Sequence, residues 1–338
     1  MAASTGVAPA GRGPGYARCP GAVPGRRPLP PVLVATALRQ EGLVSAAQCE
    51  AAGVGAERRR ALARSGRATP VQRAVLDLAP SIVSVAASRA DPAARRRRAA
   101  WLGLLAVGPR AVAVGPCALA LLGVEGLPGD IRPEVALPGA SHRRPRGGVV
   151  VRSFDHGMPV VRVGSARVAA APWALAQAVC ELDRAHAVAV LDSALQRGLL
   201  PGGLDPVDAL VRGRRGAAAA RPWLRLADGR AQSPLETWAR LQCADAGIPP
   251  HELQVAVRDL RGRIVARGDL GWWRCDGRLL VVEIDGIGPH TDPTALFADR
   301  VRQNAVVATG TADVLRFTAR DVARGGVIPA AVRDYLTL

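Results

Sequence analysis

At the start of the patterned part of the chain, residues 32–80, the apolar and polar positions predict short helices followed by a hairpin. Residues 32–40 follow a helical pattern that Gly42 ends, and Ser45 stands as the N-cap of a second helix over 46–52. A third helix, over 56–65, carries four arginines: Arg58, Arg59, Arg60 and Arg64. Residues 66–70 then turn the chain into the apolar segment 71–78. This order is typical of a winged helix-turn-helix with the arginine helix in a DNA major groove. A small helical bundle whose arginines face water fits the same spacing.

The middle of the chain mixes short apolar strands with helices. Strand-like runs stand at 111–114, 134–137 and 149–152, and helical patterns cover 95–107, 170–182, 186–197 and 204–226. The run Arg95–Arg98 opens the first of these helices, and a solvated face is the expectation for such a charge run. The sequence therefore predicts four parts: a disordered basic tail (1–31), a winged helix-turn-helix (32–80), a mixed α+β middle region (81–230) and a C-terminal domain (231–338).

The C-terminal segment has the clearest pattern. Ser233-Pro234-Leu235-Glu236 combines an N-cap serine, a proline at the first helical position and a glutamate three residues after the cap, so it predicts a helix start with a capping box. Two alternating runs, 253–259 and 264–270, predict a β-hairpin, and 278–285 predicts a central strand. A helix over 294–309 and a last strand over 314–317 complete an α/β domain.

Charge and composition indicate a polyanionic partner. The net charge is +17 and the isoelectric point is near 11.3; all 45 basic residues are arginine, because the chain has no lysine. Such a charge attracts nucleic acid, and arginine holds phosphates bidentately. A solvated basic surface without a nucleic-acid partner is the alternative that fits the same charge. The six cysteines show no CxxC pair, which argues against a zinc site or a disulfide framework. With neither a membrane-spanning apolar run nor a signal-peptide pattern, we expect a cytoplasmic protein without a membrane partner.

Acids within the predicted strands are the candidate chemistry. Asp269 ends one apolar strand, while Glu283 and Asp285 share one face of the next. Because neighbouring strands lie about 4.8 Å apart, acids at matched heights can share one hard cation. A buried carboxylate requires a partner, and the alternative to a metal is an ion-pair network with arginine. The nearest arginines in the sequence, which also suit a phosphate, are Arg300, Arg302 and Arg316.

The order of these motifs resembles the endonuclease-like domain related to very-short-patch-repair endonucleases, a branch of the PD-(D/E)xK superfamily. The resemblance rests on these segments, within residues 231–322: Ser233-Pro234-Leu235-Glu236, Asp269-Leu270, Val282-Glu283-Ile284-Asp285-Gly286, His290, Asp299-Arg300-Val301-Arg302-Gln303-Asn304 and Leu315-Arg316-Phe317. It implies a restriction-endonuclease-like mixed sheet flanked by helices. Residues 32–80, and 92–200 more loosely, resemble the AbiEi-type antitoxin winged-helix domain of type IV toxin–antitoxin systems.

The resemblance assigns roles to residues of the C-terminal domain. It implies that Asp269 and Glu283 bind Mg²⁺ or Mn²⁺ and that Glu236 joins the catalytic site, although capping alone explains Glu236. His290 would act as general acid or base, with an exposed loop side chain as the alternative. Asp285 stands where the superfamily has a lysine. This lysine-free pattern resembles that of the short-patch-repair branch.

Two functions follow as hypotheses. One is a divalent-metal-dependent DNA endonuclease, in which the winged helix supplies DNA affinity. The other is a non-catalytic, antitoxin-like transcriptional regulator that binds DNA and has a cognate toxin as a further partner.

Overall fold

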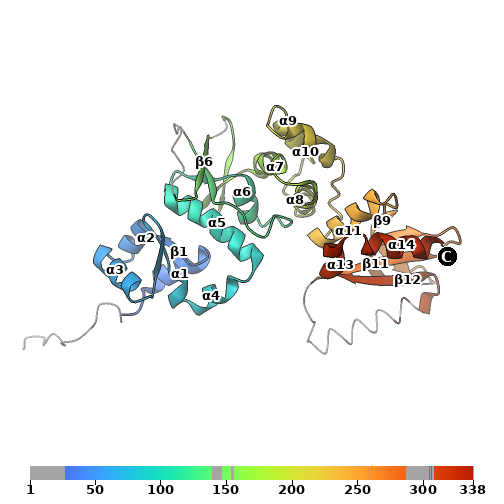
Figure 1. Ribbon diagram of the computed structural model, residues 1–338, viewed down its shortest axis with the longest axis horizontal. Coiled ribbons are helices and arrows are strands. Elements are labelled where there is room, and N and C mark those ends of the chain that lie inside the picture. The colour runs from blue at the N-terminus through green and yellow to red at the C-terminus, as the bar shows by residue number, and fades with distance from the viewer. Residues whose placement is uncertain are drawn as a thin grey trace, which may run out of the picture.

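The computed structural model describes residues 27–138, 147–153, 156–259, 261–286, 304, 306 and 308–337. Within these residues the chain is mixed α/β, with three sheets and helices packed around them (Figure 1). The predicted tail of residues 1–31 lies outside the described residues as far as position 26, and the first helix begins at Pro31.

The N-terminal elements follow the predicted order of helix, helix, arginine-bearing helix and hairpin. They are α1 (Pro31–Arg39), β1 (Leu43–Ser45), α2 (Ala46–Ala51), α3 (Ala56–Arg64), β2 (Thr69–Gln72) and β3 (Val75–Asp77). Ser45 caps α2 as expected, in a capping box with Gln48. The strands form an antiparallel sheet in the order β1-β3-β2. Buried Leu33, Val44 and Leu62 join the helices and the sheet in one core.

The middle elements surround a five-stranded mixed sheet in the order β6-β5-β4-β8-β7. Its strands are β4 (Val112–Ala113), β5 (Glu134–Leu137), β6 (Val150–Ser153), β7 (Val160–Val163) and β8 (Ala166–Ala169). The helices of this region are α5 (Pro92–Val107), α6 (Gly115–Leu121), α7 (Ala171–Val179), α8 (Arg184–Gln196), α9 (Asp205–Val211) and α10 (Ala217–Leu224). The two preceding helices, η1 (Ala79–Ser81) and α4 (Val83–Ser88), pack instead in the N-terminal core through Ala79 and Val85. Leu43 and Val75 of the N-terminal sheet belong to the core of this region, so the two parts share buried surface.

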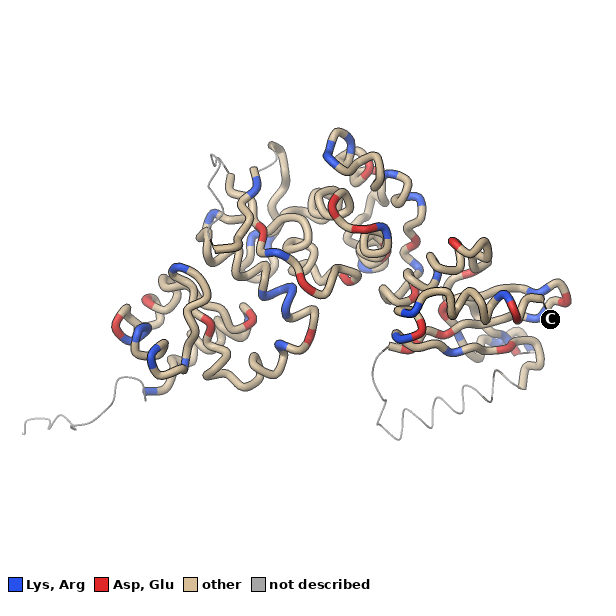
Figure 2. The backbone as a smooth tube through the Cα atoms, viewed as in Figure 1, with Lys and Arg blue, Asp and Glu red and all other residues tan. Residues whose placement is uncertain are grey.

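The expectation that Arg95–Arg98 forms a solvated face holds only in part, since the side chains of Arg95 and Arg97 are 38% and 40% exposed but that of Arg98 is 22% exposed. These arginines, blue at the start of α5 in Figure 2, are half-buried. Arg97 donates to the carboxylate of Glu41 at 2.6 Å. Arg98 donates to the buried carboxylate of Asp77 at 3.0 Å. Arg97 and Arg98 therefore fasten α5 to the N-terminal elements, through Glu41 before β1 and Asp77 of β3.

The C-terminal elements form a four-stranded sheet in the order β12-β11-β10-β9. They are α11 (Pro234–Asp245), β9 (Glu252–Arg258), β10 (Ile264–Trp273), β11 (Leu279–Asp285), β12 (Ala312–Thr318), α13 (Ala319–Arg324) and α14 (Val327–Thr337). The predicted hairpin, central strand and last strand are confirmed, and β11 pairs with β12 in parallel. Figure 1 shows α11, α13 and α14 together beside the sheet. Most of the helix expected over 294–309 lies outside the described residues.

Asp313 of β12 ties the last helix to the sheet. It accepts hydrogen bonds from Arg278 (2.7 Å) and from the hydroxyl of Tyr335 on α14. Burial alone would raise the pKa of Asp313, but these hydrogen bonds from Tyr335 and Arg278 outweigh it and hold the pKa below the usual range.

We expect Asp313→Asn to lower stability in a pH-dependent way. A carboxyl whose pKa is depressed by folding stabilises the protein above its unfolded pKa of about 3.9, and this contribution disappears as the pH falls through the folded value. Because the pair is partly exposed, the loss at pH 7 should be no more than about 1 kcal/mol. Urea unfolding of both proteins from pH 7 to pH 2 measures it; a difference that keeps its pH 7 size at the lowest pH would contradict this account.

Candidate functional site

Asp269 lies where β10 begins to part from β11. The register between these strands runs from Trp273 opposite Leu279 to Leu270 opposite Val282. At the next position the carboxylate of Asp269 accepts the backbone N–H of Ile284, at 2.7 Å. The side chain therefore takes the place of a ladder hydrogen bond, and it holds a half-buried negative charge at the point of divergence.

Glu236 enters the same region from the first turn of α11. The predicted helix start is confirmed, since the Ser233 hydroxyl accepts the Glu236 N–H at 3.3 Å. The glutamate carboxylate accepts the N–H of Gln232, at 2.9 Å, one residue before the cap, so the reciprocal half of the expected capping box is shifted. Only 6% of Glu236 is exposed.

Gln254 of β9 joins the two acids, and sequence reasoning missed it. Its amide nitrogen lies 2.9 Å from Glu236 Oε2 and 3.4 Å from Asp269 Oδ1. Its φ of +52° is unusual for a residue other than glycine and costs on the order of 1 kcal/mol. The available signal was its position: Gln254 alternates with the buried Leu253 and Val255 and stands opposite Asp269 of the neighbouring strand.

The electrostatics of Glu236 show that the acids interact. Burial raises the pKa of the Glu236 carboxyl, the N–H of Gln232 lowers it, and the negative charge of Asp269 raises it again. The structure thus brings like charges together in a partly buried place. Carboxylate oxygens in such a place are the donor set that a hard divalent cation prefers.

Glu283 is buried on β11, and its partner is an arginine. Arg316 stands beside it in the parallel register with β12, and its Nε lies 2.9 Å from Glu283 Oε2. The ion-pair alternative considered for these acids therefore holds for Glu283. Asp285, two residues further along the same strand, is exposed.

Three predicted site residues, His290, Arg300 and Arg302, lie outside the described residues. Among the residues that are described, no group of three or more histidine, cysteine, aspartate or glutamate side chains stands close enough to hold a metal ion. The acids brought together by described contacts are Glu236 and Asp269, with Glu283 on the adjacent strand.

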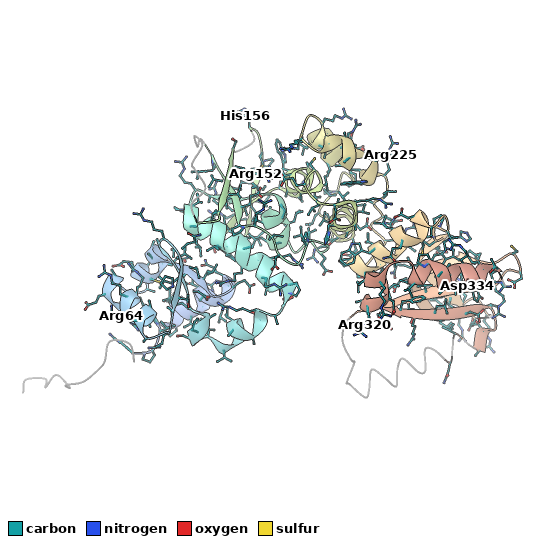
Figure 3. All side chains as sticks on the ribbon, viewed as in Figure 1. Arg64, Arg152, His156, Arg225, Arg320 and Asp334 are labelled. Atoms are coloured by element: carbon teal, nitrogen blue, oxygen red, sulfur yellow. The ribbon has the colours of Figure 1, made fainter. Side chains whose placement is uncertain are left out.

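The four arginines of α3, which are among those predicted to bind DNA, divide into two pairs. Arg58 donates to the carbonyl of Pro28 at 2.6 Å, and Arg59 donates to the carboxylate of Glu50 at 2.5 Å. These two guanidinium groups hold the N-terminal elements together. The side chains of Arg60 and Arg64, one turn apart on α3, are exposed; Arg64 is labelled in Figure 3. The second pair is the one available to a ligand.

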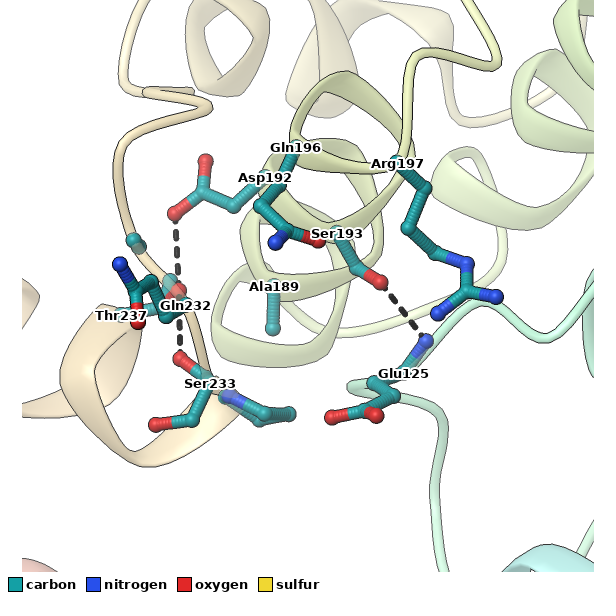
Figure 4. A pocket seen from close by; sticks show the side chains of 11 residues that line it. Glu125, Ala189, Asp192, Ser193, Gln196, Arg197, Gln232, Ser233 and Thr237 are labelled. Carbon is teal, nitrogen blue, oxygen red and sulfur yellow. Dashed lines mark hydrogen bonds between the residues drawn. The ribbon is translucent and has the colours of Figure 1, made fainter.

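The helix that carries Glu236 is fastened to the middle region. Asp192 of α8, 1% exposed, accepts hydrogen bonds from Thr237 Oγ1 (2.8 Å) and from Arg240 Nη2 (2.8 Å), both on α11. Figure 4 shows Asp192 and Thr237 joined by their hydrogen bond, among the residues that line a small cavity of about 20 Å³, enough for one water molecule. Because Thr237 follows Glu236 directly, this contact fixes the start of α11.

We expect Gly268→Ala to disturb the site through packing. A β-carbon at Gly268 would overlap the Cγ1 atom of Val281 on β11, a stiff β-branched neighbour. Overpacking of this kind costs about 1–3 kcal/mol, and the strain falls next to Asp269. Thermal unfolding measures the loss, with Gly129→Ala as a comparison for glycine replacement, because Gly129 is exposed and a β-carbon there would meet only the guanidinium of Arg95 at 3.7 Å. A melting temperature equal to that of wild type would show that the backbone of β10 shifts at no cost to make room for the added methyl group.

Comparison with known protein families finds no matching family model. Two uncharacterized proteins of Mycobacterium tuberculosis, one from strain CDC 1551 / Oshkosh and one from strain ATCC 25618 / H37Rv, are each 36% identical to the chain over 140 residues. This match covers 41% of the chain and 50% of each relative, so the chain spans about half the length of the curated relatives it matches.

The described residues contain no helix long and apolar enough to cross a membrane.

Proposed function

We propose that the protein is a divalent-metal-dependent DNA endonuclease. The observation that carries this proposal is the meeting of Asp269 and Glu236 through Gln254, beside Glu283, where β10 parts from β11. Buried like charges that are held together at such a point need a counter-charge, and a cation supplies it. The sheet order and the flanking helices support a restriction-endonuclease-like domain.

Mg²⁺ or Mn²⁺ fits the oxygen donors of this region. Asp269 and Glu236 would hold the ion, and Glu283 would join them by exchanging its contact with Arg316 for the cation. When bound, the metal would polarise a phosphodiester and activate water. Arg316 would then face the developing negative charge, as an arginine commonly does in phosphoryl chemistry. His290 is the further candidate for proton transfer.

The N-terminal elements would supply DNA affinity. Two helices followed by an arginine-bearing helix and a hairpin support a winged helix-turn-helix, in which Arg60 and Arg64 face the DNA. We propose a cytoplasmic location, where duplex DNA would be the partner.

The test is a nicking assay. The purified full chain is incubated with supercoiled plasmid and with mismatched duplexes, in Mg²⁺, in Mn²⁺ and in EDTA. Cleavage that appears with the metal and disappears with EDTA supports the proposal. No metal-stimulated cleavage of any of these substrates would overturn it.

A second candidate is an antitoxin-like DNA-binding regulator without catalysis. The ion pair between Glu283 and Arg316 favours it, because an arginine already neutralises one of the acids. Asp285, in place of the superfamily lysine, favours it too. A footprint on the promoter of the protein's own gene, with no cleavage of that DNA when Mg²⁺ or Mn²⁺ is added, would support this function. Co-purification of a toxin would identify its partner.

A further inference from the structure

The hairpin of β9 and β10 carries a group of exposed arginines beside the acids. We call them the hairpin arginines: Arg258, Arg261, Arg263 and Arg267, all exposed. One carboxylate, Asp259, lies among them and pairs with Arg263 at 2.8 Å. Between positions 258 and 267 the described residues thus hold four positive charges and one negative charge, and the hairpin keeps a net positive surface.

This surface continues into the candidate site. Arg267 lies 3.5 Å from the carbonyl oxygen of Gln254, whose amide binds the acids. From Arg263 to Arg267 a strand rises about 13 Å, which is the axial length of about four nucleotides of one DNA strand. A phosphodiester placed at Asp269 would therefore have its neighbouring phosphates within reach of the hairpin arginines.

Protection of a sheet edge is the competing explanation. β9 is the edge strand of its sheet, and charged side chains on an edge keep it from pairing with other chains. Either sign of charge serves that purpose. Only arginine, and not glutamate, attracts phosphate. Charge reversal therefore separates the two explanations.

We propose that the hairpin arginines bind the sugar-phosphate backbone of duplex DNA and lead one strand to the acids. This inference rests on the proposed function and adds the surface through which the substrate is held. Contacts of this kind are made to phosphate rather than to base edges, so they give affinity and position without sequence preference.

The experiment measures DNA affinity without cleavage. The full chain is titrated onto a fluorescent duplex in EDTA, over a range of salt concentrations, and anisotropy gives the association constant. The test variant is Arg261→Glu/Arg267→Glu. The matched control is Arg215→Glu/Arg225→Glu, two exposed arginines that flank α10, with the same change of charge.

We expect the test variant to lose at least tenfold in affinity near 100 mM salt. The slope of log K against log salt should become shallower by about 2, because each lost phosphate contact removes about 0.9 from it. The control should keep nearly the whole slope. An unchanged slope in the test variant, or an equal loss in the control, would overturn the proposal.

A second variant, Arg258→Ala/Arg267→Ala, tests the edge explanation, because Arg258 lies on the edge strand β9. If it aggregates while binding DNA as tightly as wild type, the arginines protect the edge and the proposal is wrong. If it stays monomeric and loses affinity, the proposal holds. The proposed nuclease activity is judged separately. If the wild-type protein binds DNA but does not cleave it, only the proposed catalysis is refuted. If the wild-type protein cleaves DNA and the hairpin variants bind DNA as tightly as it does, only the hairpin surface is refuted.

Discussion

Replacement of Asp269 by asparagine should abolish metal-dependent nicking, with a fall in rate of about 10³-fold or more. A metal ion contributes several kcal/mol to phosphodiester hydrolysis, and each 1.36 kcal/mol is tenfold in rate. Asp269 is the acid through which the other groups meet: it accepts the N–H of Ile284 and approaches the amide of Gln254. Loss of its charge removes the strongest attraction for the cation.

The asparagine variant is chosen because it separates chemistry from folding. Its amide oxygen can still accept the N–H of Ile284, so the end of the β10–β11 ladder keeps its hydrogen bond. We expect the melting temperature to stay close to that of wild type, while Mn²⁺ binding measured by calorimetry is lost. Asp334→Asn, an exposed acid on α14 labelled in Figure 3, is the matched control and should bind metal and nick DNA normally. Wild-type nicking by Asp269→Asn would show that the acid has no catalytic role.

The arrangement of the C-terminal strands could be predicted because its signals are local. Alternation marks β9 and β10, an apolar run marks β11, and Ser233 with Pro234 marks the start of α11. Each of these signals acts within a few residues, where backbone preference and side-chain direction are fixed together. The order of the acids along these elements was enough to predict that Asp269 and Glu283 lie on neighbouring strands.

The partners of the charged groups could not be predicted in the same way. The sequence left metal or arginine open for Glu283, and the pairing with Arg316 depends on the parallel register of β12. Arg97 finds Glu41 across 56 positions, and no periodic pattern reports such a distant contact. Gln254 was missed because its left-handed backbone turns a strand residue toward two acids. These contacts arise from packing between elements, which local patterns do not encode.

Replacement of Asp192 by alanine should lower the free energy of unfolding by about 3–5 kcal/mol, the range for breaking one side of a buried ion pair. The carboxylate is 1% exposed and accepts hydrogen bonds from Thr237, Arg240 and the backbone N–H of Asp228. Without it, the guanidinium of Arg240, itself 13% exposed, would keep a buried charge with its strongest partner gone. Urea unfolding followed by circular dichroism measures the loss.

A double variant shows whether the buried charges or the hydrogen bond between Thr237 and Asp192 position the start of α11. In Asp192→Leu/Arg240→Leu both charges are gone and apolar contact fills the space, so stability should recover in part, as buried ion pairs replaced by apolar groups often do. The hydroxyl of Thr237 would still lack its acceptor, and the start of α11 would be held less firmly beside Glu236. Metal affinity should therefore remain reduced even where stability returns. Equal recovery of both properties would mean that α8 stabilises α11 without positioning Glu236.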